Sequence, residues 1–275
     1  MATESQPATT SVSSASVDER PRPRLHVKGA TKHFGGRVVV DIDDLMFCNH
    51  PIEGLIGPNG AGKTTLMRVI MHAVSLDGGT VTFLPADGED PKVLSKMPAH
   101  AIPRLGVVKS NQVTQDFDRL TIWDSLLLSV AEPSDEHPWQ IYREPGLFSD
   151  HEEEIRYYLD YFGFDDPSRF ARSTGEKKLL DIVRCLLMRP RLLLLDEPTA
   201  GLPDELSDLV MDLVRERART DNISVVIVEH DLRIVWDVTD YVHFMAEGEV
   251  LLQGDPEWVR SHNIVAEKYL GGAHV

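Results

Sequence analysis

The sequence predicts an α/β fold: a mostly parallel sheet with helices on its faces, an antiparallel β unit on the N-terminal side and a helical insertion in the middle. In the second half, short apolar runs at 192–195 and 223–228 alternate with helix-length segments, which is typical of a parallel sheet covered by helices. These runs have the length of strands that are buried on both faces. A glycine-rich loop at 57–62 lies between another apolar run and a helical segment.

The elements can be assigned in chain order. Residues 1–24 are rich in Ser, Thr, Ala and Pro without apolar periodicity, so we expect a disordered tail before one domain at 25–275. Prolines and a glycine between 133 and 146 separate the helices of the insertion, which spans about 113–174. We expect strands at 25–27, 38–42, 53–56, 80–84, 107–108, 192–195, 223–228, 241–245 and 249–252, and helices at 63–73, 122–130, 152–162, 176–188, 203–220 and 231–238.

The composition is that of an ordinary globular protein, with 42% hydrophobic and 26% charged residues among 275. A formal net charge of −16 argues against a nucleic-acid-binding surface, because phosphate contacts need a basic face. No apolar run approaches the roughly 18 residues of a membrane span, and the first residues lack the basic and apolar regions of a signal peptide. We expect Cys48 and Cys185 to be buried apolar side chains rather than a disulfide, a metal pair or a nucleophile.

The glycine-rich loop reads Gly57-Pro58-Asn59-Gly60-Ala61-Gly62-Lys63-Thr64, a complete Walker A motif. Its glycines let main-chain amides surround a β-phosphate, and the helix that follows offers its positive N-terminal end. Lys63 should reach the β- and γ-phosphates of ATP, and the Thr64 hydroxyl should bind Mg²⁺. The strand before and the helix after the loop make a chance match improbable. The residues expected to contact the nucleotide here are Gly57, Asn59, Gly60, Ala61, Gly62, Lys63, Thr64 and Thr65.

Two acidic residues, Asp196 and Glu197, follow the apolar run 192–195 directly. Carboxylates at the carboxyl end of a buried strand face the ligand in open α/β sheets. Asp196 should hold Mg²⁺, and Glu197 should act as the general base that polarises the attacking water. His230 follows the next apolar run, and although a lone histidine is more often structural, a γ-phosphate contact is the better interpretation at this position.

Together these motifs resemble those of ATP-binding cassette (ABC) transporter subunits, which are P-loop NTPases, over about residues 25–270. That family carries a signature loop, usually Leu-Ser-Gly-Gly-Gln, just before the strand with the acidic pair. The segment here reads Arg172-Ser173-Thr174-Gly175-Glu176. The resemblance implies that Ser173 and Gly175 contact the γ-phosphate held by an opposite subunit. Arg172 and Thr174 depart from the pattern, and Thr174 is stiffer and bulkier than glycine.

The resemblance also implies roles for residues outside the main motifs. Phe34 resembles the aromatic residue that stacks on adenine, with an ordinary core aromatic as the alternative. Gln112 aligns with a glutamine that contacts Mg²⁺ and the attacking water, although the residues just before it depart from the family pattern and Gln115 competes for the role. The segment 200–204 occupies the position of a loop where subunits usually touch.

The end of the chain, Tyr269-Leu270-Gly271-Gly272, and the segment Thr199-Ala200-Gly201-Leu202 are similar to importer ATPases for branched-chain amino acids, urea or short amides. The resemblance then implies two membrane-spanning permease subunits, a second ABC ATPase in a head-to-tail dimer, an external substrate-binding protein and a cytoplasmic location on the inner face of the membrane. A lipopolysaccharide-export ATPase is the nearest alternative in sequence style. The identity of the transported substrate stays open.

The altered signature loop predicts unequal ATP sites in a heterodimer, because each loop would complete the partner's site: this chain's own Walker residues would form the stronger site. In a homodimer we expect slow hydrolysis at both sites.

Two rival functions remain. The first is a soluble ABC ATPase that acts in DNA repair or translation; the single cassette, the acidic charge and the lack of heptads argue against it. The second is a regulatory cassette that binds ATP without hydrolysing it; Glu197 and His230 argue against that function.

Overall fold

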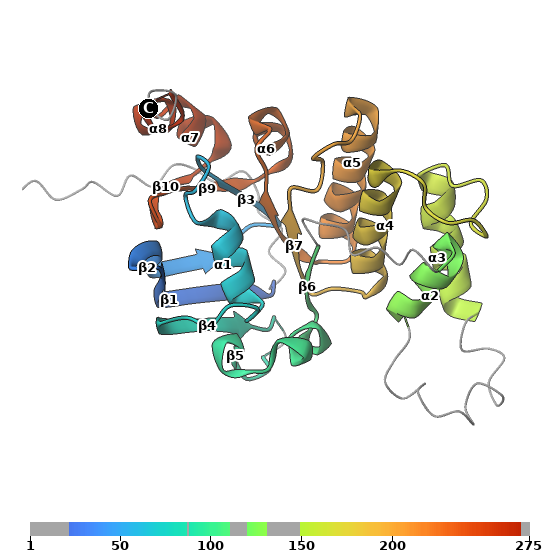
Figure 1. Cartoon of the computed structure of the whole chain (residues 1–275), viewed down its shortest axis with the longest axis horizontal. Helices are drawn as coiled ribbons and strands as arrows, with labels where there is room; N and C mark the ends of the chain where they lie inside the picture. The colour runs from blue at the N-terminus through green and yellow to red at the C-terminus, as the bar shows by residue number, and fades with distance from the viewer. Residues whose placement is uncertain (1–21, 87, 111–119, 131–148, 271–275) are drawn as a thin grey trace, which may run out of the picture.

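A computed structural model describes residues 22–86, 88–110, 120–130 and 149–270 of the chain. The fold is α/β, as predicted, with one antiparallel and one mostly parallel sheet (Figure 1). In the four-stranded antiparallel sheet the order is β2-β1-β4-β5. Its strands are β1 (Arg24–Phe34), β2 (Arg37–Phe47), β4 (Gly78–Leu84) and β5 (Lys92–Val93).

The six-stranded sheet has the order β10-β9-β3-β8-β7-β6, and only β10 runs antiparallel to its neighbour. Strands β7 and β8 are built almost entirely of Val, Ile and Leu, and β3 also contains Glu53 and Gly54. Each of the three is buried at every position, as a sheet covered on both faces requires. The strands are β3 (Ile52–Ile56), β6 (Val107–Lys109), β7 (Leu192–Asp196), β8 (Ser224–Val228), β9 (Tyr241–Ala246) and β10 (Glu249–Gly254).

Helices cover this sheet and form the insertion (Figure 1). Helix α1 lies between the two sheets, α5 and α6 follow β7 and β8, and α2 and α3 lie together beside α4, far from the C-terminal helices. One hydrophobic cluster joins α2, α3, α4 and α5 to β7 and β8, and a second joins α1 to both sheets. The helices are α1 (Lys63–Ile70), α2 (Ile122–Val130), α3 (Ser149–Tyr161), α4 (Thr174–Leu187), α5 (Asp204–Thr220), α6 (Leu232–Val238), α7 (Pro256–Ser261) and α8 (Asn263–Leu270).

Several elements differ from those predicted. The folded part begins before Leu25, because the Arg22 guanidinium donates hydrogen bonds to the carbonyl oxygens of Ala218 and Ile223, each at 3.0 Å. Strand β5 and three short 3₁₀ turns between 94 and 105 were not predicted. Each is too short to show a periodic pattern of apolar residues. Helices α7 and α8 were also missed. The prediction of a disordered tail falls mostly on residues outside the described part of the chain.

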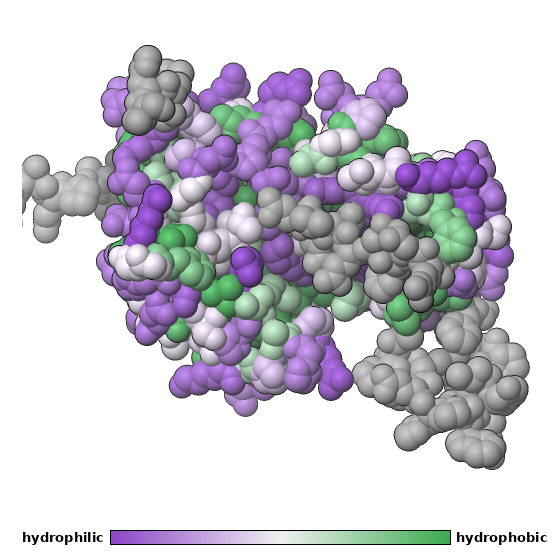
Figure 2. Space-filling view, in the orientation of Figure 1, coloured by the Kyte–Doolittle hydropathy of each residue, from purple (hydrophilic) through white to green (hydrophobic). Residues whose placement is uncertain are grey.

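The surface is mostly hydrophilic, with small separated hydrophobic patches on the face shown in Figure 2, which agrees with the acidic composition. Among the described residues, no helix is both long and apolar enough to span a lipid bilayer.

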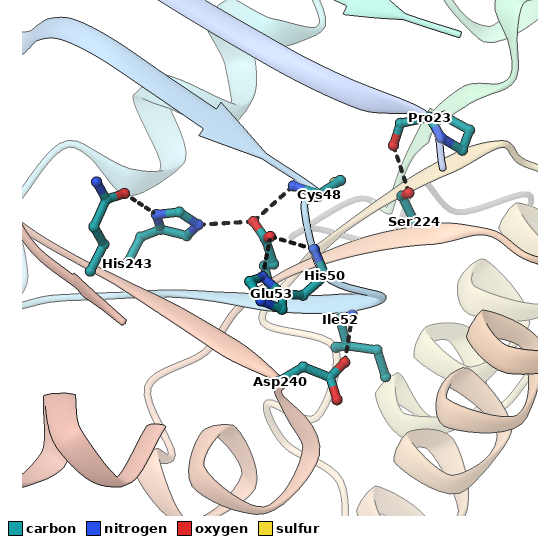
Figure 3. A network of polar contacts seen from close by, with 9 residues as sticks. Pro23, Cys48, His50, Ile52, Glu53, Ser224, Asp240 and His243 are labelled. Atoms are coloured by element: carbon teal, nitrogen blue, oxygen red, sulfur yellow. Dashed lines mark hydrogen bonds and ion pairs between the residues drawn. The ribbon is translucent and has the colours of Figure 1, made fainter. Parts of the chain in front are cut away.

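One polar network lies inside the fold, at the start of β3 (Figure 3). The Glu53 carboxylate is fully buried and accepts hydrogen bonds from the backbone N–H of Cys48 at 2.8 Å and of His50 at 2.9 Å, while His243 Nε2 lies 2.9 Å from Oε2. Burial alone would raise the pKa of Glu53, but the hydrogen bonds from His243 and His50 outweigh it and lower that pKa to about 2. This network is fully paired and joins β2, β3 and β9.

Candidate active site

The candidate site lies along one edge of the six-stranded sheet. Strands β3, β8, β7 and β6 are parallel neighbours, so their carboxyl ends meet at the same edge. The residues that follow them are the glycine-rich loop after β3, His230 after β8, Glu197 after β7 and Ser110 after β6. The carboxyl edge of such a sheet is where ligands bind in open α/β folds. Segments far apart in the sequence are thereby brought together.

Two glycines of the loop have positions that no residue with a side chain could occupy. Gly57 has φ of 153°, and a Cβ there would lie 1.9 Å from the carbonyl oxygen of Met245. Gly62, just before α1, has φ of 105°, and a Cβ there would lie 2.2 Å from the carbonyl oxygen of Val39. Both glycines are therefore required by close contacts to β9 and β2 as well as by the turn. Asn59 and Gly60 are exposed at the tip of the loop.

Lys63, the first residue of α1, is buried at 5% exposure and folds back over the loop. Its ammonium donates to the carbonyl oxygens of Gly57 at 2.6 Å and Pro58 at 3.1 Å. Burial lowers the pKa of Lys63, while the carboxylates of Glu197 and Asp196 counteract that shift. The ammonium therefore lies in the same electrostatic environment as the acidic pair.

Asp196 is completely buried at the end of β7, and its surroundings fit a cation. Lys109 Nζ lies 3.0 Å from Oδ2, yet neither carboxylate oxygen accepts a hydrogen bond from the described residues. Because an unsatisfied buried carboxylate is costly, oxygen atoms of this kind suit a hard cation such as Mg²⁺. Thr64 and Thr65 lie half-buried in the first turn of α1. Asp196 and Thr64 are the residues that would hold the ion.

Glu197 and His230 form the exposed part of the edge. His230 Nε2 lies 2.9 Å from Glu197 Oε1, with exposed side-chain fractions of 45% and 19%. Glu197 has φ of 51°, a left-handed conformation that is uncommon for a residue with a side chain. Backbone strain of this kind persists only where the surrounding structure fixes it, and active sites are one such place. The carboxylate lies next to a histidine that can orient it.

Glu229, which we did not single out from the sequence, fixes the backbone next to this pair through hydrogen bonds to Thr199 and His230. It is buried, and its Oε1 accepts hydrogen bonds from the backbone N–H of Thr199 at 2.9 Å and from the Thr199 hydroxyl at 2.6 Å. Its Oε2 accepts a hydrogen bond from the backbone N–H of His230 at 3.0 Å. Glu229 therefore ties the segment 199–202 to His230. The signal that could have identified Glu229 in the sequence is its position between the apolar run 223–228 and His230.

Two lysines at the edge were also missed. Lys109 pairs with Asp196, and Lys178 on α4 is buried at 6% exposure near the same acidic residues. Burial lowers the pKa of Lys178, and the carboxylates of Glu229 and Glu197 act against that shift. A buried lysine next to a carboxylate cannot be recognised from the sequence alone, because the two residues are far apart in the chain.

The signature segment lies at the N-terminus of α4. Ser173 is the N-cap: its hydroxyl accepts a hydrogen bond from the backbone N–H of Glu176 at 3.0 Å, and Glu176 returns the contact in a capping box. Arg169 Nη2 donates to Glu176 Oε1 at 2.7 Å, and this bond, acting against desolvation, lowers the pKa of Glu176 to about 2. Arg172 and Thr174 are both exposed on this turn.

Ser173 and Gly175 line a pocket of about 420 Å³. The other lining residues are Phe162, Gly163, Phe164, Arg169, Glu176, Leu179, Gly201, Pro203 and Leu206. The lining contains none of residues 57–65. Figure 1 shows α4 and α1 on either side of β6 and β7. The chain therefore does not bring its own signature segment to its own glycine-rich loop.

The remaining predicted residues lie apart from the edge or outside the described chain. Phe34, at the end of β1, is 48% exposed, so the alternative of a core aromatic is not supported. The Lys32 ammonium lies 5.4 Å from the centre of the Phe34 ring.

Gln112 and Gln115, the two candidates for the glutamine that contacts Mg²⁺ and the attacking water, fall outside the residues that the structure describes.

The fold and the site together define a P-loop nucleotide-binding protein, and comparison with known proteins specifies the family. The family model described as ABC transporter matches residues 44–200. The high-affinity branched-chain amino acid transport ATP-binding protein BraF of Pseudomonas aeruginosa is 30% identical over 259 residues, covering 92% of this chain and 99% of BraF. The chain belongs to the ABC transporter family and is an ATP-binding subunit.

Two further likenesses bear on its function. The lipopolysaccharide export system ATP-binding protein LptB of Haemophilus influenzae is 32% identical over 248 residues, covering 90% of this chain and 97% of LptB. The crystal structure of the ADP conformation of an ATP-binding cassette of an ABC transporter has a TM-score of 0.71 and 26% identity, covering 90% of this chain and 99% of the other. The whole cassette is therefore shared with these relatives.

Proposed function

We propose that this chain hydrolyses ATP at the edge formed by Lys63, Asp196, Glu197 and His230, and that hydrolysis drives uptake of branched-chain amino acids, urea or a related small polar solute. The observation that carries the catalytic part is the Glu197–His230 pair at 2.9 Å. Next to it lies the buried Asp196, whose oxygens accept no hydrogen bond from the part of the chain that the structure describes. Together with Lys63 these residues supply a base, a site for Mg²⁺ and a cation for the phosphates.

The roles follow from the chemistry of each group. The backbone N–H groups of residues 60–65 and the Lys63 ammonium hold the β- and γ-phosphates. When bound, Mg²⁺ neutralises charge that develops on the transferred phosphoryl group. Glu197 takes a proton from the attacking water, and His230 orients that carboxylate and contacts the γ-phosphate. Phe34 stacks on the adenine, where its exposed ring is accessible. Gln112 completes the set in this proposal.

The catalytic assignment can be tested with Glu197→Gln, which keeps the size of the side chain and removes the base. We expect the ATPase rate of the dimeric or transporter-bound protein to fall by about 100- to 1000-fold, with binding of a fluorescent ATP analogue retained. Glu249→Gln, which changes an exposed glutamate on β10, is the matched control and should keep the rate of the unmodified chain. In a homodimer of this chain, where every site carries the change, turnover that survives Glu197→Gln would exclude Glu197 as the base.

The signature segment belongs, in this proposal, to a partner's site. Because Ser173 and Gly175 line a pocket without the chain's own glycine-rich loop, a second ATPase arranged head-to-tail would place them against its nucleotide. With a different ATPase as partner, the exposed Arg172 and Thr174 would weaken only the partner's site. Glu197→Gln should then remove most turnover, whereas the equivalent change in the partner removes little. The reverse result would mean that the strong and weak sites are assigned wrongly.

Uptake is supported by the similarity to BraF over nearly the whole of both chains. The partners would be two permease subunits and an external binding protein, with this chain on the cytoplasmic face of the membrane. Purification of tagged chain from native membranes in mild detergent, followed by mass spectrometry, would test this. Two multi-span proteins should copurify; ribosomal or DNA-repair proteins alone would contradict a transport role.

A second candidate is lipid export, favoured by the 32% identity to LptB. The same copurification distinguishes the two. Recovery of an external solute-binding protein together with the permeases would indicate uptake. Recovery of envelope-bridging proteins together with the permeases would indicate export. Solute uptake assays in cells that lack this chain then decide between a small polar solute and a lipid.

A further inference from the structure

The C-terminal helix α8 contacts the glycine-rich loop through one hydrogen bond. The backbone N–H of Gly57, the first residue of the loop, donates to the hydroxyl oxygen of Tyr269 at 3.0 Å, across 212 positions of sequence. In the sequence, Tyr269 indicated only a branch of the family. The structure gives its hydroxyl a specific partner, and that partner is the backbone from which the loop begins.

Tyr269 is held in place on several sides. Its ring packs against Phe244 of β9, with ring centres 6.0 Å apart, and it lies against the hydrophobic cluster that contains Ile56 and Val265. One residue earlier, Lys268 Nζ lies 2.6 Å from Glu247 Oε1 in the turn after β9. Burial raises the pKa of the Tyr269 phenol, so the hydroxyl keeps its proton at neutral pH. The hydroxyl is therefore presented to the loop by a packed ring rather than by a free side chain.

Gly57 has contacts on three sides. A Cβ on this residue would collide with the carbonyl oxygen of Met245, its N–H is bonded to Tyr269, and its carbonyl oxygen accepts the Lys63 ammonium at 2.6 Å. The peptide groups on both sides of Gly57 are thus oriented by different elements. Loss of the contact from α8 would leave a buried N–H without its acceptor and free the start of the loop to rotate.

We propose that Tyr269 is a positioning residue for nucleotide binding: by fixing the first peptide of the glycine-rich loop, it couples the docking of α8 to the affinity for ATP. This rests on the proposed function, in which residues 57–65 hold the phosphates. The coupling is reciprocal by thermodynamic necessity. If docked α8 strengthens ATP binding, bound ATP must stabilise docked α8 by the same factor.

Tyr269→Phe tests the proposal because it removes the hydroxyl and keeps the ring against Phe244. We expect the dissociation constant for ATP, and the KM of the ATPase, to rise about fivefold, the order of one hydrogen bond, with kcat at saturating ATP unchanged. Tyr161→Phe is the matched control. Its hydroxyl donates to the Leu209 carbonyl oxygen at 3.1 Å, on an exposed surface of other helices, so ATP binding should stay as in the unmodified chain.

Hydrogen exchange of the α8 amides provides a second measurement that does not depend on turnover. ATP should slow exchange in α8 of the unmodified chain and of Tyr161→Phe, by a factor similar to the change in affinity, and should do so less in Tyr269→Phe. Equal dissociation constants for Tyr269→Phe and the control would overturn the coupling. Absence of ATP binding in the unmodified chain would instead refute the proposed function, so the two failures are distinguishable.

Discussion

Two carboxylates on strands of the same sheet, Glu53 and Asp196, are both completely buried, but their surroundings differ. Glu53 receives hydrogen bonds from two backbone N–H groups and lies against the ring nitrogens of His243 and His50 (Figure 3). Asp196 has the Lys109 ammonium at 3.0 Å, and among the described residues neither of its oxygens accepts a hydrogen bond. One carboxylate is satisfied by the protein, and the other is left with open coordination.

This contrast separates a structural role from a functional one. A buried charge is tolerated when the protein pairs it fully, and it stabilises the fold only in that case. A buried carboxylate whose oxygens accept too few hydrogen bonds costs stability and therefore needs an explanation, such as an ion that supplies the missing contacts. Position on the sheet agrees with this, because Glu53 lies near the start of β3 and Asp196 at the carboxyl end of β7.

The sharpest test of the contrast is Asp196→Asn. We expect the Mg²⁺-dependent ATPase rate to fall about 1000-fold or more, because the amide holds a divalent cation poorly. The free energy of unfolding should change by less than about 1 kcal/mol, since the lost pairing with Lys109 is offset by relief of a buried charge. Steady-state rates and urea unfolding measure the two effects. A large loss of stability would mean that Asp196 is a structural residue like Glu53.

The reciprocal change is Glu53→Gln. Its amide would direct N–H groups at the N–H donors of Cys48 or His50, so we expect the free energy of unfolding to fall by about 4 kcal/mol. Urea or thermal unfolding measures this. The ATPase rate per folded molecule should be retained at a temperature where the variant is folded. A stable variant with lost activity would reverse the roles assigned to the two carboxylates.

Acid should weaken the fold through Glu53. Its pKa is about 2 in the folded chain against an ordinary 4.5, so its contribution is complete above pH 4.5 and is lost as pH falls toward 2. The free energy of unfolding should decrease by up to about 3 kcal/mol over this window through this group. Unfolding curves at several pH values, for the unmodified chain and for Glu53→Gln, give the difference. Identical pH slopes for the two proteins would be inconsistent with the paired network.

The smallest expected effect concerns Phe34, which we propose stacks on the adenine and which is 48% exposed rather than part of the core. Phe34→Ala should raise the KM for ATP about fivefold through loss of stacking, which corresponds to about 1 kcal/mol. The melting temperature should hardly change, because the ring is 48% exposed. Rates as a function of ATP concentration and a thermal melt measure both. A drop in stability with unchanged KM would assign the ring to packing.

Much of the fold could be predicted because its strands and helices are signalled locally. The apolar runs at 192–195 and 223–228 became β7 and β8, and the helix expected at 122–130 became α2 with the same bounds. Helices α7 and α8 were missed because their apolar residues, such as Val259 and Val265, are few and fit no clear period. The position of α7 depends on packing against β9 and β10, and α8 packs against α7.

The candidate site could be predicted in part for a similar reason. Lys63, Asp196 and Glu197 lie in short motifs, and the parallel sheet brings these motifs to one edge. The contacts of Lys109 with Asp196 and of Tyr269 with Gly57 join residues far apart in the chain, and no local pattern signals them. The roles of Gln112 and of the signature residues stay predictions, since they depend on residues or subunits beyond those described.

The two cysteines provide a built-in probe of how the molecule opens. Cys48 lies in the cluster that joins the antiparallel sheet to α1, and Cys185 lies in the cluster of α2–α5, so each thiol belongs to a different half of the core. Burial raises the pKa of both thiols, which keeps them protonated and unreactive while the chain is folded. Alkylation rates at the two positions would therefore report separately on the transient exposure of the two clusters, without the replacement of any residue.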